Sequence, residues 1–276
     1  MIGVDYIEKR AISEGDRIRF KTDGFVHLKG LFSHDQIAEV GEAVEEAGRE
    51  SADPMVRDSD RPDRWIWPRS AIVENFIFNM GVGTLAAELL ETTSTRLIHD
   101  VFFRRTGAVK GTPWHRDSDF WEFRNGSALT IWIPLQSTPA TMALQYVPGS
   151  HLMPDLRLLK RFEKALVPLR HRVVRFDMAL GDVAIHHYRT LHSSSHYHEP
   201  LLRRALAIHT IDADARFSEP KNIYQRDHNS RCGWDVLREG NSFPDHLAPI
   251  LQPQSIKSPR LAEILHLGRL RSRIES

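Results

Sequence analysis

The chain has 276 residues and one cysteine, and its 37 lysines and arginines nearly balance its 36 aspartates and glutamates. A near-neutral charge with both signs interspersed argues against the basic field of a nucleic-acid-binding protein. A single cysteine excludes an intramolecular disulfide and is compatible with a reducing compartment. The first residues lack the apolar run of a secretion signal or membrane span. We therefore expect a cytoplasmic protein that contacts neither nucleic acid nor membrane.

The N-terminal third has helical patterns on either side of a polar segment. Ser33 and Gln36 form a capping-box pattern at the start of the first expected helix. Its apolar stripe follows at helical spacing and consists of Ile37, Val40, Val44 and Ala47. Residues 50–64 are polar and arginine-rich, which predicts a loop. A second helix is indicated by Leu85, Leu89 and Leu90.

The middle of the chain has the pattern of a β-fold. Between residues 96 and 212 short β-rich runs alternate with glycine, proline and polar turns, and no helical pattern interrupts them. This density of strands predicts a closed or double-sheet antiparallel β-fold. We expect one domain over residues 1–276: helical decoration over 1–95, a β-barrel core over 96–215, and a C-terminal loop and helix over 216–276. Ser258 and Pro259 are typical of the start of that last helix.

His115 and Asp117 lie two residues apart, and His192 follows far along the chain. Alternate residues of a strand point to the same side, so His115 and Asp117 could converge on one ion. We expect His192 at the end of a strand that follows the turn at Gly181 and Asp182. Two imidazoles and one carboxylate match the facial triad of non-haem Fe(II) oxygenases. The His-x-Asp spacing alone is common by chance, because the chain has fifteen histidines.

Arg203 and Ser194 strengthen this interpretation. An oxygenase with open metal positions needs a co-substrate, and a keto acid needs a cation for its distal carboxylate. Arg203 is expected one hairpin beyond His192, and its planar guanidinium can bind a carboxylate through two parallel hydrogen bonds. Ser194 could add a hydroxyl donor to the same carboxylate.

Several motifs in order along the chain resemble the phytanoyl-CoA dioxygenase-like family of Fe(II)/2-oxoglutarate oxygenases. They are DGFVHLKGLF (23–32), TPWHRD (112–117), LTIWIPL (129–135), YVPGSH (146–151), GD (181–182), LHSS (191–194) and RRAL (203–206). The resemblance implies a mainly β fold with flanking helices, the double-stranded β-helix (a cupin-like jelly roll). It also implies that Fe(II) is bound by His115, Asp117 and His192. Finally, it implies that 2-oxoglutarate is contacted by Arg203, Ser194 and Trp132, with dioxygen as the second co-substrate.

The substrate site is less constrained by the sequence. The resemblance places a substrate-facing aromatic near Phe120 and Trp121, although both rings could equally belong to the core. Arg104 or Arg105 could bind an acidic group, whereas a surface position is the default for arginine. We expect the mouth of the pocket to be formed by residues 50–64, the segment after Asp117, and residues 222–241. Its side chains would include Trp121, Tyr224, Trp234, Arg57, Arg61 and Arg226, which suits a polar or anionic small molecule.

The leading hypothesis is a 2-oxoglutarate-dependent dioxygenase that hydroxylates an unactivated C–H bond of a small polar metabolite and releases succinate and CO2. The carboxylate of Asp117 favours hydroxylation, desaturation or ring formation over halogenation, because halogenases need that position for halide. Two alternatives stay open: a metal-dependent β-barrel enzyme without 2-oxoglutarate, and an inactive binding module of the same fold. A homodimer also stays open.

Overall fold

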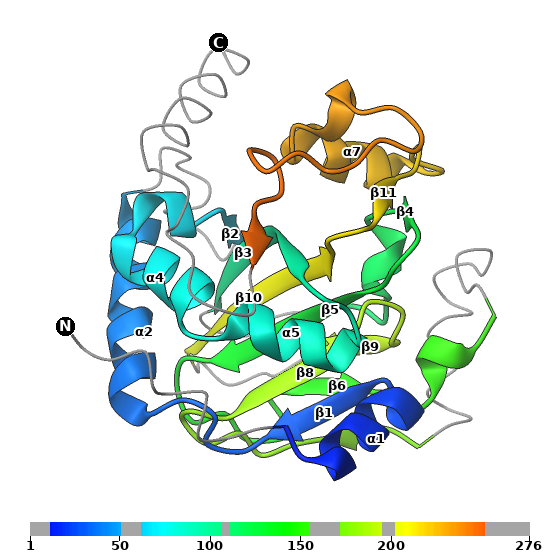
Figure 1. Ribbon diagram of the computed structural model, residues 1–276. Helices are drawn as coiled ribbons and strands as arrows, with labels where there is room; N and C mark the ends of the chain where they lie inside the picture. Colours follow the sequence, from blue (N-terminus) through cyan, green and yellow to red (C-terminus); the bar gives the residue numbers. More distant parts are fainter. Residues whose placement is uncertain (1–11, 51–61, 106–110, 155–171, 195–201, 252–276) are drawn as a thin grey trace.

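The computed structural model describes residues 12–50, 62–105, 111–154, 172–194 and 202–251 (Figure 1). Two antiparallel sheets form the centre of this part of the chain. The larger sheet consists of β1 (Phe25–Leu28), β2 (Asp63–Arg64), β3 (Thr95–Arg105), β5 (Ala128–Pro134), β8 (Val183–His187), β10 (Arg203–Asp212) and β12 (Ile250–Leu251). Its strand order is β1-β8-β5-β10-β3-β12, with β2 paired to β3.

The smaller sheet covers one face of the larger sheet. Its strands are β6 (Leu144–Tyr146), β7 (Val174–Arg175) and β9 (His192–Ser194), in the order β7-β6-β9. Tyr146 on β6 stacks on Phe25 of β1 with ring centroids 4.7 Å apart. Trp132, Ala184 and Ala207 of the larger sheet belong to the same apolar cluster. Two facing antiparallel sheets confirm the predicted jelly-roll architecture, the double-stranded β-helix.

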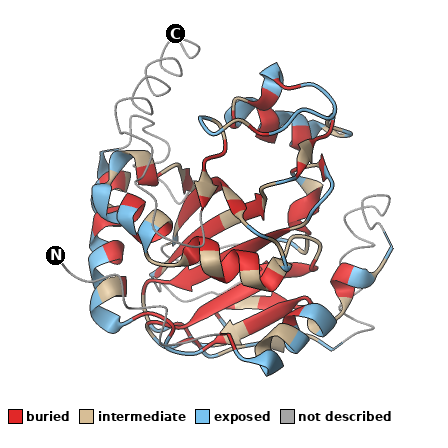
Figure 2. Cartoon of the chain, in the orientation of Figure 1, coloured by how far each residue is buried: buried red, intermediate tan, exposed pale blue. Residues whose placement is uncertain are grey.

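Within the described residues, four helices precede most of the strands. They are α1 (Glu14–Asp23), α2 (His34–Arg49), α4 (Ala71–Asn79) and α5 (Val82–Leu90). Their apolar faces share one core cluster with the face of the larger sheet that is turned away from the smaller sheet. Figure 2 shows the consequence: the strands are largely buried, whereas the helices are exposed on the side away from the sheet. None of the helices in the described ranges is long and apolar enough to cross a membrane.

The predicted capping box is confirmed at the start of α2. The Ser33 hydroxyl accepts a hydrogen bond from the Gln36 amide (3.2 Å), and the Gln36 side chain accepts one from the Ser33 amide (2.7 Å). The predicted apolar stripe is buried: Ile37 and Val44 are fully enclosed. The helix predicted around Leu85 is α5. The helix predicted from Ser258 lies outside the described residues.

A small region beyond the two main sheets contains α7 (Ile223–Arg231) and a two-stranded sheet of β4 (Phe123–Arg124) and β11 (Arg216–Phe217). In Figure 1 it lies at one end of the two sheets. Single 3-10 turns lie at Trp67–Arg69, Asp117–Asp119, Ser150–Leu152 and Trp234–Val236. The helix α7 escaped sequence prediction because its residues are almost all polar and show no apolar period.

The predicted course of the chain into His192 is partly wrong. The turn at Gly181 and Asp182 is present: Gly181 has φ +92°, and the Asp182 carboxylate accepts from the amides of Gly30 (2.7 Å) and Ala179 (3.0 Å). However, His192 is not at the end of β8. The chain leaves the larger sheet after His187 and enters the smaller one, so His192 faces β8 from across the barrel.

A buried carboxylate on β3 fixes the segment between β2 and α4. The Asp100 side chain accepts hydrogen bonds from the amides of Ile66 (2.9 Å) and Trp67 (3.2 Å), and its carbonyl accepts one from Trp65 (3.1 Å). Because Asp100 is fully buried, desolvation raises its pKa to about 7 in spite of these donors. The carboxyl therefore holds a proton in the folded protein at pH values where the unfolded chain has released it.

We expect this carboxyl to make the folded state less stable as the pH rises. Its pKa is 3.8 when unperturbed and about 7 in the fold, so its stabilising contribution is lost between about pH 4 and about pH 7. The loss is at most about 4 kcal/mol at 1.4 kcal/mol per unit. Asp100→Asn removes the titration. Urea unfolding at several pH values should show the wild type losing stability relative to the variant across this range.

Asp245→Asn, a change at an exposed carboxylate, serves as the control, because it should leave the pH dependence of the wild type nearly unchanged. A difference in unfolding free energy between wild type and Asp100→Asn that does not vary with pH would contradict the assignment.

Candidate metal centre and its cavity

The structure brings the three side chains of the predicted triad together. The Nε2 atom of His192 lies 3.6 Å from Oδ1 of Asp117, and the Nε2 atom of His115 lies 3.9 Å from the same oxygen. The two imidazole rings are 4.2 Å apart. These donor atoms could hold one metal ion. They lie in a cavity of about 310 Å³.

Backbone pairing explains how residues so distant in sequence meet. His115 and His192 exchange two backbone hydrogen bonds of 3.0 Å each, so the segment around His115 is pinned to β9. Asp117 does not continue an extended strand, as its spacing from His115 had predicted. It begins a 3-10 turn, which is held by a hydrogen bond from the Ser118 amide to the Tyr188 carbonyl (3.0 Å). The turn, rather than strand alternation, directs the carboxylate toward the two histidines.

Neighbouring groups orient each of the three donors. The Nδ1 atoms of His115 and His192 lie 2.7 Å and 3.0 Å from the carbonyls of Pro113 and Thr190. A carbonyl only accepts, so Nδ1 carries the proton and Nε2 directs a lone pair at the other donors. The Thr130 hydroxyl donates to Oδ2 of Asp117 (2.6 Å), which leaves Oδ1 facing the imidazoles.

The ionisation of the triad suits a divalent cation. Burial lowers the pKa of both His115 and His192 to about 4, so both rings are neutral at pH 7. Burial alone would raise the pKa of Asp117, but His192 and His186 beside it bring the pKa well below its usual range. Two neutral imidazoles and one carboxylate supply one negative charge, which is the donor set of non-haem Fe(II) sites.

Other histidines surround the triad. His186 lies on β8 with its Nε2 atom 3.3 Å from Oδ2 of Asp117. Its ring is 4.2 Å from that of His192. His187 faces away from the cavity and hydrogen-bonds to Ser127 (2.8 Å). His196 and His198 lie outside the described residues.

Two of the three residues expected to contact 2-oxoglutarate line the cavity. Arg203 and Trp132 are each 2% exposed, and Arg203 donates to the Met142 carbonyl (2.9 Å). Ser194 is placed differently from the expectation. Its hydroxyl accepts a hydrogen bond from the Thr112 amide (2.8 Å), and it does not line the cavity formed by the described residues.

The expectation for Arg104 is wrong. Arg104 points to the outer face of β3 and pairs with Glu45 of α2 (3.4 Å), where Arg204 also pairs with Glu45 (3.6 Å). Strand alternation turns their neighbours inward: Arg105 and Arg203 lie opposite each other in the β3–β10 register, and both line the cavity. The cavity-facing arginine of β3 is therefore Arg105.

The expected aromatic residues divide between wall and core. Phe120 and Trp121 both line the cavity, and Tyr224 of α7 joins them. Trp234 is fully buried against Phe243, with ring centroids 4.7 Å apart, so its placement at the mouth is wrong. Arg226 is exposed and is not among the lining residues. Residues 51–61, with Arg57 and Arg61, lie outside the described part of the chain.

The described wall of the cavity carries more positive than negative charge. Several of its residues cannot be predicted from the sequence, because they face the cavity only through the packing of α7, β2 and β3. The lining arginines are Arg64, Arg105, Arg203 and Arg231, and the lining carboxylates are Asp117 and Asp227. Burial lowers the pKa of the lining His209 to about 4 and of His228 to about 3, so these imidazoles are neutral at pH 7. Such a wall favours anionic ligands.

The fold agrees with that of known proteins. The sequence profile of the phytanoyl-CoA dioxygenase (PhyH) family matches residues 20–205. The "Probable alpha-ketoglutarate-dependent hypophosphite dioxygenase" of Stutzerimonas stutzeri is 28% identical over 165 residues, which are 55% of this chain and 50% of that protein. The chain thus spans about half the length of this curated relative.

Solved structures share the fold at low sequence identity. The carbocyclase SnoK of nogalamycin biosynthesis, described as non-heme and alpha ketoglutarate dependent, has a TM-score of 0.72 at 21% identity, over 87% of this chain and 97% of its own. The epimerase SnoN, in complex with Fe3+, alpha ketoglutarate and nogalamycin RO, has a TM-score of 0.70 at 24% identity, over 87% of this chain and 98% of its own. EctD from S. alaskensis, with 2-oxoglutarate and 5-hydroxyectoine, has a TM-score of 0.63 at 21% identity, over 78% of this chain and 83% of its own. With most of its length matched by the family profile, the chain belongs to the phytanoyl-CoA dioxygenase family of iron- and 2-oxoglutarate-dependent oxygenases.

Proposed function

We propose that the protein is an oxygenase in which His115, Asp117 and His192 hold Fe(II) and Arg203 and Trp132 hold 2-oxoglutarate. The observation that carries this proposal is the convergence of two Nε2 atoms and one carboxylate oxygen, each oriented by a hydrogen bond on its far side. Bound iron and 2-oxoglutarate supply the oxidising chemistry, with succinate and CO2 as products. The residues of the chain supply binding, orientation and exclusion of water.

Each residue has a distinct part in this arrangement. The carbonyls of Pro113 and Thr190 keep the proton of each imidazole on Nδ1, so that Nε2 stays available for the metal. Arg203 is nearly fully buried, and a bidentate bond to a carboxylate is stronger there than in water. The ring of Trp132 closes the same wall against solvent.

We propose hydroxylation of a small polar or anionic molecule as the reaction. A cavity of about 310 Å³ with four arginines in its wall suits a compact anion better than a long acyl chain. The probable dioxygenase described above is named for hypophosphite, a small anion, which agrees with this wall. SnoK and SnoN are named for ring formation and epimerisation, so within this fold the outcome depends on how the substrate is held. Phe120 and Trp121 are the residues that we propose hold it, with Arg105 as the cation.

The overall proposal is tested by adding 2-oxoglutarate to the Fe(II) protein without oxygen. We expect the weak visible metal-to-ligand charge-transfer band of a chelated keto acid. Its absence in well-folded protein would contradict the proposal, because a metal enzyme without 2-oxoglutarate and an inactive module both lack it. Succinate formation is then compared for small anions, small neutral molecules and long-chain acyl thioesters. Stimulation by the thioesters alone would refute the proposed substrate class.

We expect the ligand variants to separate metal binding from folding. Asp117→Ala and His192→Ala should abolish turnover and weaken Fe(II) binding by roughly 100-fold or more, whereas Thr130→Val, which removes only the orienting hydroxyl, should weaken it by roughly tenfold. Anaerobic Fe(II) titration measures the affinity, and circular dichroism checks the fold. His187→Asn is the matched control, since its half-buried ring lies nearby but faces away. Full turnover in His192→Ala would show that another histidine, such as the neighbouring His186, is the ligand.

Adjacent arginines test the site for 2-oxoglutarate. Arg203→Lys keeps the charge but loses the two parallel hydrogen bonds, so it should raise the half-saturating concentration of 2-oxoglutarate by roughly tenfold, with Fe(II) affinity little changed. Arg204→Lys, on the outer face beside Glu45, should behave as the wild type. The proposal fails if the effect appears in Arg204→Lys and is absent from Arg203→Lys.

A further inference from the structure

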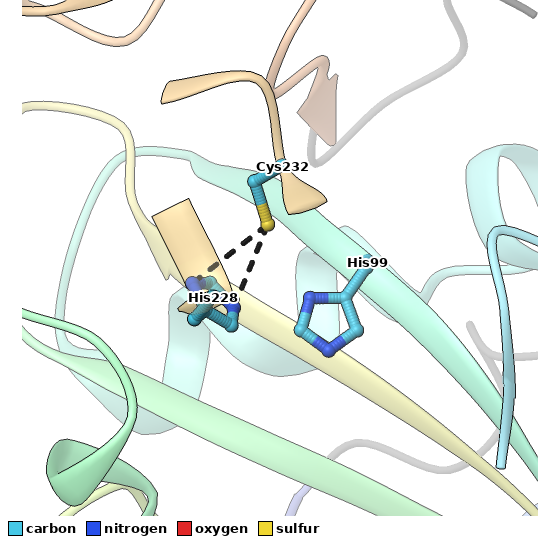
Figure 3. A group of neighbouring side chains, drawn as sticks. All are labelled: His99, His228 and Cys232. Carbon is cyan, nitrogen blue, oxygen red and sulfur yellow. Dashed lines mark hydrogen bonds between the residues drawn. The ribbon is translucent and has the colours of Figure 1, made fainter. Parts of the chain in front are cut away.

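A second group of metal-ligating side chains lies apart from the triad. It consists of His99 on β3, His228 on α7, and Cys232 directly after that helix. One donor atom from each residue lies within 4.8 Å of the other two (Figure 3). All three side chains are 91% or more buried. His228 and Cys232 are four residues apart and therefore share one face of the helical turn.

The sulfur-to-nitrogen distance between Cys232 and His228 fits a tetrahedral ion. The Cys232 sulfur lies 3.5 Å from Nε2 of His228. Zinc bonds of about 2.3 Å to sulfur and about 2.0 Å to nitrogen, at a tetrahedral angle, place those two atoms about 3.5 Å apart. Figure 3 shows one ring nitrogen of His99 turned toward the other two side chains, so a small inward movement would complete a three-ligand set.

A purely structural role accounts for only part of the group. Cys232 can donate its thiol proton to His228, and the His228 ring packs on Trp234 with centroids 5.2 Å apart. Neither contact involves His99. Within the described ranges the Nδ1 atom of His99, whose side chain is 4% exposed, has no hydrogen-bond partner. A buried ring nitrogen without a partner is costly, and a metal ion would satisfy it.

We propose that His99, His228 and Cys232 form a second metal site for a borderline-soft ion such as Zn²⁺. A thiolate with two imidazoles selects such ions over Mg²⁺ or Ca²⁺, which prefer oxygen. Binding forms a metal–sulfur bond and releases the thiol proton to solvent. Arg64 lies close enough to Cys232 for a Coulombic interaction between the two side chains.

The cavity supplies access to this site. His99 and His228 line the same cavity as the triad, whereas Cys232 does not, so an ion can enter from the cavity and keep a fourth position open toward it. The two sites differ in donor chemistry, one with a carboxylate and one with a thiolate. This proposal does not depend on the proposed oxygenase function.

Cobalt(II) provides a readout specific to sulfur. Cys232 is the only cysteine of the chain, so a thiolate-to-cobalt charge-transfer band in the near ultraviolet can arise only there. We expect metal-free protein to take up two equivalents of Co²⁺, with the band developing for one of them and disappearing when Zn²⁺ displaces cobalt. Asp117→Ala should lose the other equivalent and keep the band.

The variants of the second site should lose or weaken the charge-transfer band and retain cobalt binding at the triad, the reverse of Asp117→Ala. Cys232→Ser should lose the charge-transfer band and still bind one equivalent of Co²⁺ at the triad. His99→Phe and His228→Phe should each weaken, by roughly tenfold or more, the cobalt affinity measured from the development of the band. Circular dichroism and thermal unfolding verify the fold, and Zn²⁺ should raise the midpoint of the wild type above that of Cys232→Ser. Two outcomes overturn the proposal: no band in folded wild type at saturating cobalt, or a band unchanged in both histidine variants, which would mean that the thiol binds metal alone.

Discussion

The reciprocal backbone hydrogen bonds between His115 and His192 are the constraint on which the candidate metal centre depends. They join a loop that belongs to neither sheet to the edge strand of the smaller sheet. Ser194 extends the connection, because its amide donates to the Thr112 carbonyl (3.2 Å) and its hydroxyl accepts from the Thr112 amide. Ser194, which was expected to bind the keto acid, thus connects the loop that carries His115 to β9. Both histidines are held before any metal arrives, which lowers the entropy cost of binding.

From Asp117 a series of hydrogen bonds and ring contacts crosses the barrel. The Asp117 carboxylate is held by Thr130 on β5, and the same hydroxyl lies 2.8 Å from Nδ1 of His209 on β10. The ring of His209 lies 4.6 Å from that of His99 on β3, whose ring is 5.3 Å from that of His228. Burial keeps these imidazoles neutral, so the positive charge of the cavity comes from its arginines. The inner faces of three neighbouring strands thereby connect the triad with the second cluster.

How far the sequence predicts this arrangement depends on the range of the interaction that decides each feature. The capping box of Ser33 follows from a local pattern and the antiparallel β class from the density of strands, whereas the jelly roll and the metal-binding role of the triad are what the resemblance to the family implies. Arg104 was misplaced because either of two consecutive arginines can face inward, and the choice is made by the register with β10. Trp234 was misplaced because an aromatic ring suits both a pocket and a core. The His99, His228 and Cys232 group could not be predicted, since it exists only where α7 packs over β3.

Two donor sets that can be reached from one cavity would have a consequence for metal selectivity. A site of imidazole and carboxylate ligands generally binds Fe(II) less tightly than the later divalent metals, so the triad has little means of refusing them by affinity. A thiolate changes the competition, because borderline-soft ions gain more from sulfur than Fe(II) does. With both sites accessible from the same cavity, an intruding Zn²⁺ ion would gain most at Cys232, and Fe(II) would meet less competition at Asp117. The different ligands of the two sites would then favour Fe(II) over Zn²⁺ at the triad, which the affinity of the triad alone does not do.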